Sequence, residues 1–343
     1  MSRQAVGRAS AHEACDLVDW PRDATRRLYS DPFVCSHRLH EFEMFSDASL
    51  ATLIDRFPHE RLEVATMVSG RAGWSDWHIV DYRGVSGTDL IAAIRRGSLW
   101  ARLMRVDLVS QEIADLMRTV YAHILHLTPD LEIIWSQPSI LISSARAQVY
   151  YHADAFPTML WHIRGRKRVW TYPLNDETLV SQQALEEIIA GSFYQMAPYR
   201  EEFDRRAGVF ELPEGHLLCW PPHAPHRVEN LSDLNVSLTF WYESTISLRR
   251  REIYMANRAL RKYLRIRRPS TREEGAFPDL KRRAYRLARR LGMLKTGKLD
   301  PPTVAHYRID PSSENGVAPL PGGVQLPFLG NRAIRAESAP YFN

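Results

Sequence analysis

Two short segments of the chain carry side chains that could bind one transition metal together. The first contains His152 and Asp154, and the second contains His223 and His226. Two imidazoles and one carboxylate on one side of a divalent iron leave the opposite side open, as in non-haem Fe(II) oxygenases. A His-x-Asp pair arises by chance in many proteins, so the elements that hold these residues decide whether they meet.

Short strands are predicted around both segments. From residue 133 onward, runs of β-branched and aromatic residues alternate with Pro, Gly, Asn and Asp, which is typical of antiparallel strands joined by turns. Alternate side chains of a strand share a face, so His152 and Asp154 are expected to point the same way. The spacing predicts a sandwich or barrel, with one helical insert at 176–193.

Helical periodicity dominates the rest of the chain. It predicts helices at 47–57, 86–97 and 109–129 before the strands, and at 251–268 and 281–294 after them. The expected organisation is a flexible N-terminus at 1–20, a mixed α/β buttress at 21–132, a β core at 133–245, a basic helical segment at 246–298 and a Pro/Gly-rich extended tail at 299–343.

Composition excludes several classes of protein. The chain has 343 residues, of which 45% are hydrophobic and 25% charged, which excludes a mainly disordered, collagen-like or coiled-coil protein. Its three cysteines, Cys15, Cys35 and Cys219, are too sparse for a disulfide framework or a zinc site. Because the sequence has no apolar run of signal-peptide or membrane-spanning length, we expect a cytoplasmic protein without a transmembrane segment.

The net charge of +5 is unevenly distributed. Residues 249–298 hold 18 Lys and Arg against four acidic residues, a net charge of +14, so the remainder carries −9. This segment is expected to have strongly basic outer faces and to meet an anionic partner, either nucleic acid, a membrane surface or an acidic protein. The apolar stripes of its two helices are expected to form a homodimer interface.

Residues 139–242 resemble the JmjC-type, cupin-like Fe(II)/2-oxoglutarate oxygenases, in particular the branch of the asparaginyl hydroxylase factor inhibiting HIF and its bacterial cupin-like relatives. The resemblance rests on four motifs in the family order: His152-Ala-Asp154, Gly165-Arg-Lys167, the turn and strand from Pro221 to Asn230, and Ser237 to Trp241. It implies an all-β core with α additions, a double-stranded β-helix (jelly roll, cupin) flanked by N-terminal helices and followed by basic helices.

The resemblance also implies roles for individual residues. His152, Asp154 and His226 would bind Fe(II); His226 is preferred to His223 because Arg-Val-Glu-Asn follows it, as in the family strand. Lys167, the only lysine before residue 262, would pair with the distal carboxylate of 2-oxoglutarate. Thr158 and Thr239 fall where relatives place polar residues in the cosubstrate pocket.

The activity that the resemblance implies is hydroxylation of a C–H bond of a polypeptide or small-molecule substrate, with O₂ consumed and succinate and CO₂ released. Relatives carry bulky aromatics before the distal histidine, where this chain has Ala224 and Pro225, so the substrate stays open. One alternative is a non-catalytic cupin-like sensor that binds partners through its basic C-terminus. Another is a cupin isomerase or thiol dioxygenase, against which Lys167 argues.

Overall fold

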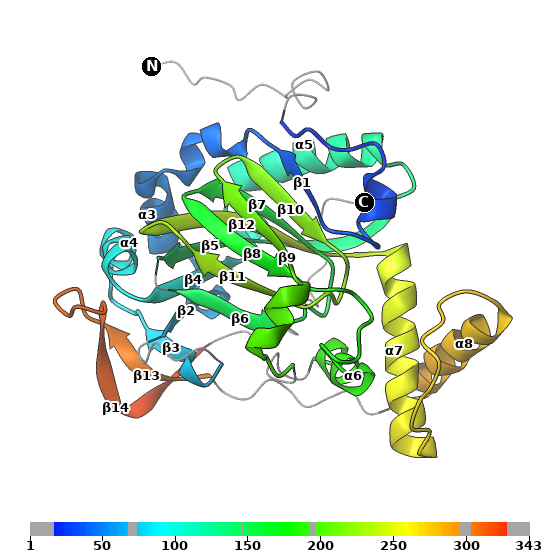
Figure 1. Cartoon of the computed structure of the whole chain (residues 1–343). Coiled ribbons are helices and arrows are strands. Elements are labelled where there is room, and N and C mark those ends of the chain that lie inside the picture. The colour runs from blue at the N-terminus through cyan, green and yellow to red at the C-terminus, as the bar shows by residue number, and fades with distance from the viewer. Residues whose placement is uncertain (1–16, 68–73, 146, 192–196, 295–302, 328–343) are drawn as a thin grey trace.

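Eight antiparallel strands form the centre of the molecule (Figure 1). The computed structural model describes residues 17–67, 74–145, 147–191, 197–294 and 303–327, so Cys15 and most of the predicted flexible N-terminus lie outside the described residues. The central strands are β5 (Ile133–Ser144), β6 (Gln148–His152), β7 (Thr158–Arg164), β8 (Arg166–Thr171), β9 (Gly208–Pro213), β10 (His216–Trp220), β11 (His226–Asn230) and β12 (Leu234–Ser244).

The chain distributes these strands between two sheets. The larger sheet contains the order β10-β7-β12-β5, and the smaller sheet has the order β6-β11-β8-β9. Between β5 and β8 the chain changes sheet with every strand, and it does so again from β9 to β12. This winding gives two sheets of four central strands each, which is the topology of a double-stranded β-helix.

The larger sheet continues on both sides of the central strands. β1 (Phe33–Ser36) pairs with β10, and β4 (Leu99–Met104), β2 (Leu62–Thr66) and β3 (His78–Asp81) extend the side of β5. β13 (Thr303–Ile309) pairs in parallel with β3 and forms a hairpin with β14 (Val317–Leu326). The sheet therefore crosses the boundary expected near residue 132, and the described part of the expected tail is a sheet-edge hairpin.

Three helices of the N-terminal half confirm the predicted periodicity. They are α3 (Asp47–Asp55), α4 (Gly87–Arg96) and α5 (Gln111–Leu127), and the short α2 (Ala24–Arg27) precedes them. Each of the three longer helices begins after a serine, Ser46, Ser86 or Ser110, whose side chain accepts a hydrogen bond from a backbone N–H of the first turn. Their apolar faces belong to the largest hydrophobic core.

Alternation along β7 separates two cores. Met159, Trp161 and Ile163 belong to the large core that also contains the buried faces of α3, α4 and α5. Leu160, on the opposite face, packs between the two sheets with apolar residues of β8, β9, β10 and β11. The side chains of β7 that share the parity of Leu160 therefore point into the interior of the β-helix.

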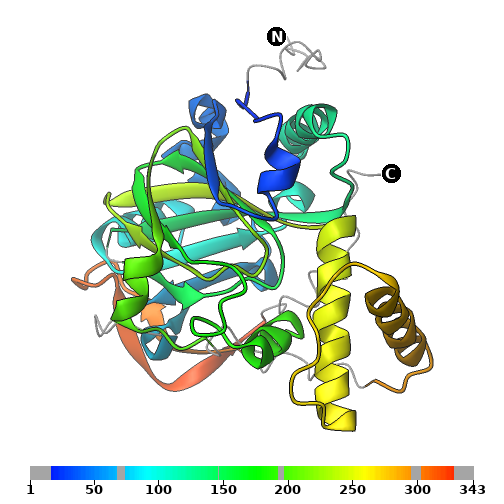
Figure 2. The ribbon, with the colours of Figure 1, turned by 45° about the vertical axis from the view of Figure 1, so that its right-hand side comes forward.

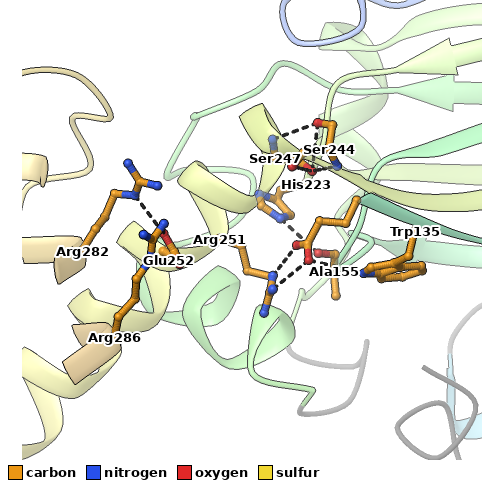
Figure 3. Close-up of polar contacts among 10 residues, drawn as sticks. Trp135, Ala155, His223, Ser244, Ser247, Arg251, Glu252, Arg282 and Arg286 are labelled. Atoms are coloured by element: carbon orange, nitrogen blue, oxygen red, sulfur yellow. Dashed lines mark hydrogen bonds and ion pairs between the residues drawn. The ribbon is translucent and has the colours of Figure 1, made fainter. Parts of the chain in front are cut away.

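The remaining helices are α6 (Gln182–Ile189), α7 (Thr245–Leu264) and α8 (Ala276–Arg290). α7 follows β12 directly and begins six residues before the predicted start, because Ser244 and Ser247 form a capping box there (Figure 3). α8 lies on the side of α7 that faces away from the sheets (Figures 1 and 2). Among the described helices, none is both long and apolar enough to span a membrane.

Candidate metal centre

Two neighbouring strands of the smaller sheet place the candidate histidine ligands side by side. His152 is the last residue of β6, His226 is the first of β11, and the two are Cα partners in the antiparallel pair. Paired residues of adjacent strands point to the same face. Their ring centroids are accordingly 4.1 Å apart, and both side chains are buried.

Asp154 completes the cluster from the turn after β6. Its Oδ1 lies 3.8 Å from Nε2 of His152, and its Oδ2 lies 3.6 Å from Nε2 of His226. One ligand atom of each residue lies within 4.8 Å of the others. Thr158, at the start of β7, donates a hydrogen bond of 2.7 Å to Oδ2 of Asp154. That bond fixes the carboxylate, which is how outer residues orient metal ligands.

Backbone carbonyls set the protonation of both histidines. Nδ1 of His152 lies 2.7 Å from the Tyr150 carbonyl oxygen, and Nδ1 of His226 lies 3.1 Å from that of Ala224. A carbonyl only accepts, so Nδ1 carries the proton and the Nε2 lone pair is directed at the cluster. Burial lowers the pKa of His152, and burial together with His152 holds the pKa of His226 well below its ordinary value. Both imidazoles are therefore neutral, as metal binding requires.

His223 takes part in other contacts. Arg250 donates from Nε to Nδ1 of His223 at 3.1 Å, so Nε2 carries the proton and donates to the Ala155 carbonyl oxygen at 3.3 Å. Burial and the nearby Arg250 charge lower the pKa of His223 to about 3. His223 also holds a left-handed φ of 68° in the Pro-rich turn. With both ring nitrogens engaged, it braces the loop after Asp154, and His226 is the histidine that joins the cluster.

β8 positions Lys167 in the same interior. Lys167 faces Asn230 across the β8–β11 pair, and in that register Thr171 faces His226. Lys167 therefore points to the same side as His226, on the order of 13 Å deeper along the strands. The chain passes from β7 in the larger sheet to β8 in the smaller sheet at Gly165, where φ is +87° and an added Cβ would lie 2.6 Å from the Leu234 carbonyl oxygen. Only glycine fits this turn, which explains the Gly-x-Lys spacing.

Lys167 is a buried cation without a counterion. Its side chain is 3% exposed, and among the described residues it has no hydrogen bond or ion pair. Burial lowers the pKa of Lys167 to about 7. An isolated ammonium inside a protein is costly, so this residue fits an anionic ligand better than it fits a structural role.

The sequence assigned no ligand-binding role to two residues near Lys167. His162 is fully buried, and it hydrogen-bonds through Nδ1 with the Ser237 hydroxyl at 3.1 Å while Nε2 has no partner among the described residues. The Lys167 charge, after burial, lowers the pKa of His162, which is about 3. Asn230 donates from Nδ2 to the carbonyl oxygens of Ser144 and Ala147 and so ties the two sheets together. The shared parity of positions 158, 160 and 162 was the available signal for His162.

Thr158 and Thr239 occupy different positions relative to the cluster. Thr158 contacts Asp154, as described above, whereas the Thr239 hydroxyl donates to the Ser139 carbonyl oxygen at 3.3 Å. Both face the interior, because Thr239 is the Cα partner of Leu160. The structure therefore places Thr158 beside the metal ligands and Thr239 on the neighbouring strand, and their expected contact with a cosubstrate stays a prediction.

Aromatic residues surround the cluster. Trp74 meets the His152 ring edge-on at 5.6 Å and donates from Nε1 to the Tyr151 carbonyl oxygen at 3.1 Å. The Trp220 ring lies 4.5 Å from that of His226. Trp74 comes from the N-terminal half of the chain, and no sequence motif indicated its role. These rings lower the polarity around the ligands and keep water from them.

α7 connects to the loop that carries Asp154. Arg251 binds Glu243 through Nε and Nη2, and Trp135 donates from Nε1 to the same carboxylate at 3.4 Å. The Trp135 ring packs edge-on against Phe156, with centroids 4.8 Å apart. Figure 3 shows Arg251, Trp135, His223 and Ala155 in this network. Because α7 holds the loop at His223 and at Phe156, it serves as a rigid support for the metal cluster.

Residues 104–247 match the family of the cupin-like domain. This part of the chain, less than half of its length, is similar to cupin-like domains. The match spans all eight central strands and the three clustered ligands. It confirms the expected double-stranded β-helix and the resemblance to the JmjC-type branch, without separating the branch of factor inhibiting HIF from other branches. A search of curated proteins finds no match to this sequence.

Solved structures with related arrangements include the ribosomal oxygenase YcfD from Escherichia coli. One structure of it is 16% identical and covers 79% of this chain and 66% of that chain, with a TM-score of 0.43. A second, in complex with cobalt and 2-oxoglutarate, is 16% identical and covers 78% of this chain and 66% of that chain, with a TM-score of 0.44. A hydroquinone dioxygenase from a Sphingomonas species is 15% identical, covers 32% and 60%, and has a TM-score of 0.25.

Proposed function

We propose that the cupin-like domain is an Fe(II)- and 2-oxoglutarate-dependent oxygenase that hydroxylates a C–H bond of a polypeptide or small-molecule substrate. One observation carries the proposal. The same barrel interior holds a buried cluster of two neutral imidazoles and a carboxylate. Deeper along the strands it holds the ammonium of Lys167, which has no partner in the part of the chain that the structure describes. A cation alone or a metal cluster alone would suit many proteins, whereas the pair suits a metal-chelating dicarboxylate.

The three ligands fit a divalent iron. Two histidine nitrogens and one carboxylate oxygen are the donor set of the facial triad, and the Nδ1 hydrogen bonds already select the tautomer that exposes Nε2. With His152, Asp154 and His226 holding Fe(II), the bound iron, 2-oxoglutarate and O₂ would supply the oxidising chemistry, and the co-products would be succinate and CO₂.

Lys167 would hold the distal carboxylate of 2-oxoglutarate. The free-energy cost of burying the Lys167 ammonium is offset only when an anion lies beside it, which favours binding of the dicarboxylate at this depth. Nε2 of His162 has no partner within the described segments and lies within electrostatic range of Lys167, so it would offer a second polar contact there. Thr158 would keep Asp154 oriented, and Trp74 and Trp220 would exclude water from the cluster.

Uncoupled turnover tests the proposal without knowledge of the substrate. The full chain, anaerobically loaded with Fe(II) and mixed with 2-oxoglutarate and O₂, is expected to release succinate slowly, and Asp154→Ala is expected to abolish the release. Calorimetry with Co(II) in place of Fe(II) measures cosubstrate binding separately. Metal-dependent binding without succinate would identify a 2-oxoglutarate sensor, and absence of metal-dependent binding would exclude both functions.

A further inference from the structure

α8 exposes a continuous row of apolar side chains. Phe277, Leu280, Leu287 and Leu291 are 67%, 64%, 58% and 66% exposed, and Ala284 between them is also exposed. These five residues follow one another at steps of three or four, so they share one side of the helix. We call them the α8 stripe. Exposed apolar rows of this kind mark interaction surfaces in soluble proteins.

The opposite face of α8 explains why the stripe points outward. Arg282 and Arg286 both bind the Glu252 carboxylate of α7. Lys281 is buried and donates from Nζ to Oδ1 of Asn257 at 2.9 Å and to the Ser270 carbonyl oxygen at 2.6 Å. α8 is therefore held to α7 chiefly by charged and polar contacts, with its apolar side turned to solvent. This is the reverse of an ordinary surface helix, whose apolar side faces the core.

Positive charge borders the stripe. Arg283 and Arg290 have no ion pair or side-chain hydrogen bond within the described ranges, and both are exposed. Arg283 and Arg290 lie four residues before and three residues after Leu287, so they are its neighbours on the helix surface. The single acidic residue of α8, Asp279, is paired with Arg282.

We propose that α8 docks the protein on the surface of a bilayer that contains anionic phospholipids. The stripe would enter the boundary between headgroups and acyl chains, and Arg283 and Arg290 would bind the lipid phosphates. A helix with a basic side beside a Phe- and Leu-rich side lies in this way along a membrane interface. Each basic residue near such a surface adds to the attraction.

Other occupants fit the surface less well. Nucleic acid would use the arginines and leave the apolar stripe in water. A second copy of the chain, related by a two-fold axis, would bring the same unpaired arginines together. The four large side chains of the stripe, at roughly 200 Å² each when fully exposed, offer on the order of 500 Å², against roughly 800 Å² per partner in a stable dimer.

The full chain is tested by co-sedimentation with two kinds of vesicle, phosphatidylcholine alone and a mixture of about three parts phosphatidylcholine to one part phosphatidylserine. We expect sedimentation with the mixed vesicles only, and release at high salt. The double variant Leu280→Ser/Leu287→Ser is expected to lower the bound fraction at least about fivefold. Leu108→Ser, at a leucine that is 46% exposed elsewhere on the surface, is its matched control.

A second variant tests how much the arginines contribute to vesicle binding. Arg283→Glu/Arg290→Glu is expected to lower sedimentation as strongly as the leucine variant, whereas Arg56→Glu, at another exposed arginine, is expected to leave it unchanged. Sedimentation with neither vesicle would overturn the proposal. A concentration-dependent dimer in light scattering that Leu280→Ser/Leu287→Ser dissociates would also overturn it, because a second copy would then cover the stripe. Equal melting temperatures of all variants show that each is folded.

Discussion

Charged side chains have different partners in the β core and in the α7–α8 pair. In the core, the Lys167 side chain is buried with no counterion among the described residues, and the Asp154 carboxylate is buried beside two neutral imidazoles, so opposite charges have to come from ligands. On α7 and α8, by contrast, several arginines form ion pairs with carboxylates of the chain itself. The pairs include Arg251 with Glu243, Arg258 with Glu187, Arg261 with Glu186, and Arg282 and Arg286 with Glu252.

This difference distinguishes residues that bind ligands from residues that stabilise the fold. Residues whose partners are ligands reduce the stability of the unliganded protein and are retained for binding. Residues that the fold pairs internally contribute to stability and do not bind ligands. The comparison predicts that substitutions in the core change ligand affinity with little loss of stability, and that substitutions between α7 and α8 do the opposite.

The largest effect is expected for Asp154→Ala. The carboxylate is the one anionic ligand of the cluster, so its removal is expected to weaken binding of Fe(II) or Co(II) on the order of a thousandfold, beyond the 10–100-fold typical of outer residues. Equilibrium dialysis of the metal measures the change. Asp233→Ala, at an exposed aspartate, is the control, and equal metal affinity of the two variants would place the metal elsewhere.

Lys167→Met is expected to remove 2-oxoglutarate binding and to stabilise the protein. Methionine fills the space without a charge, so affinity should fall at least about a hundredfold in calorimetry with Co(II) present. Below the unfolded-state pKa of Lys167 the unfolded chain holds the proton more readily than the fold, so the buried lysine costs stability at neutral pH. The melting temperature of the metal-free variant should therefore rise by roughly 2–6 °C. A lower melting temperature would mean that Lys167 has a structural partner.

Thr158→Val tests the support of the metal ligand. The substitution keeps the shape and removes the hydrogen bond to Asp154, so metal affinity should fall about 10–100-fold. Thr239→Val is the matched control, because that hydroxyl donates only to the Ser139 carbonyl oxygen and metal affinity should not change. If the two variants weaken the metal equally, the loss reflects general repacking of the interior.

The sequence specified the fold of the core closely, for physical reasons that are local. β-branched runs mark the strands, and Pro and Gly mark the turns, so β5 begins at Ile133 and β12 ends at Ser244, within the expected core of 133–245. The Gly165 turn and the alternation of strand residues then place Lys167 inward. What could not be predicted were contacts between distant segments: the edge strand β13 beside β3, and Trp74 against His152.

The structure of the basic helical segment was predicted less well from the sequence than that of the core. Counting charges along 249–298 predicted a strongly basic outer face, but many of the arginines reach carboxylates of α6, α7 and β12 that sequence counting does not connect to them. The helical periodicity of 281–294 identified an apolar side, which was expected to contact a second copy of the chain. In the structure, ion pairs with Glu252 orient the helix, and the apolar side is exposed.

The pH dependence of cosubstrate binding provides a smaller, graded test of the core. Burial lowers the pKa of Lys167 to about 7, and a carboxylate binds only the protonated form, so binding takes up a proton above that pH. The affinity for 2-oxoglutarate should fall about tenfold for each pH unit above 7. His162 has a pKa of about 3 and stays neutral throughout this range. Lys167→Arg should give a flat profile, because arginine keeps its charge; a flat profile in the parent protein would remove Lys167 from the site.

The smallest effect is expected at the contact between α7 and α8. Burial opposes the charge of Glu252, but Arg286 and Arg282 hold its pKa below the ordinary value. Glu252→Gln keeps the size of the side chain and removes the charge that both arginines share, at a cost of about 1 kcal/mol. Hydrogen exchange should then show faster opening of α8, with unchanged metal and 2-oxoglutarate affinity. Glu274→Gln, at an exposed glutamate in the segment between α7 and α8, should leave the exchange rates unchanged. A loss of cosubstrate affinity in Glu252→Gln would show that α8 acts on the core through α7, because Arg250 and Arg251 connect that helix to the loop after Asp154.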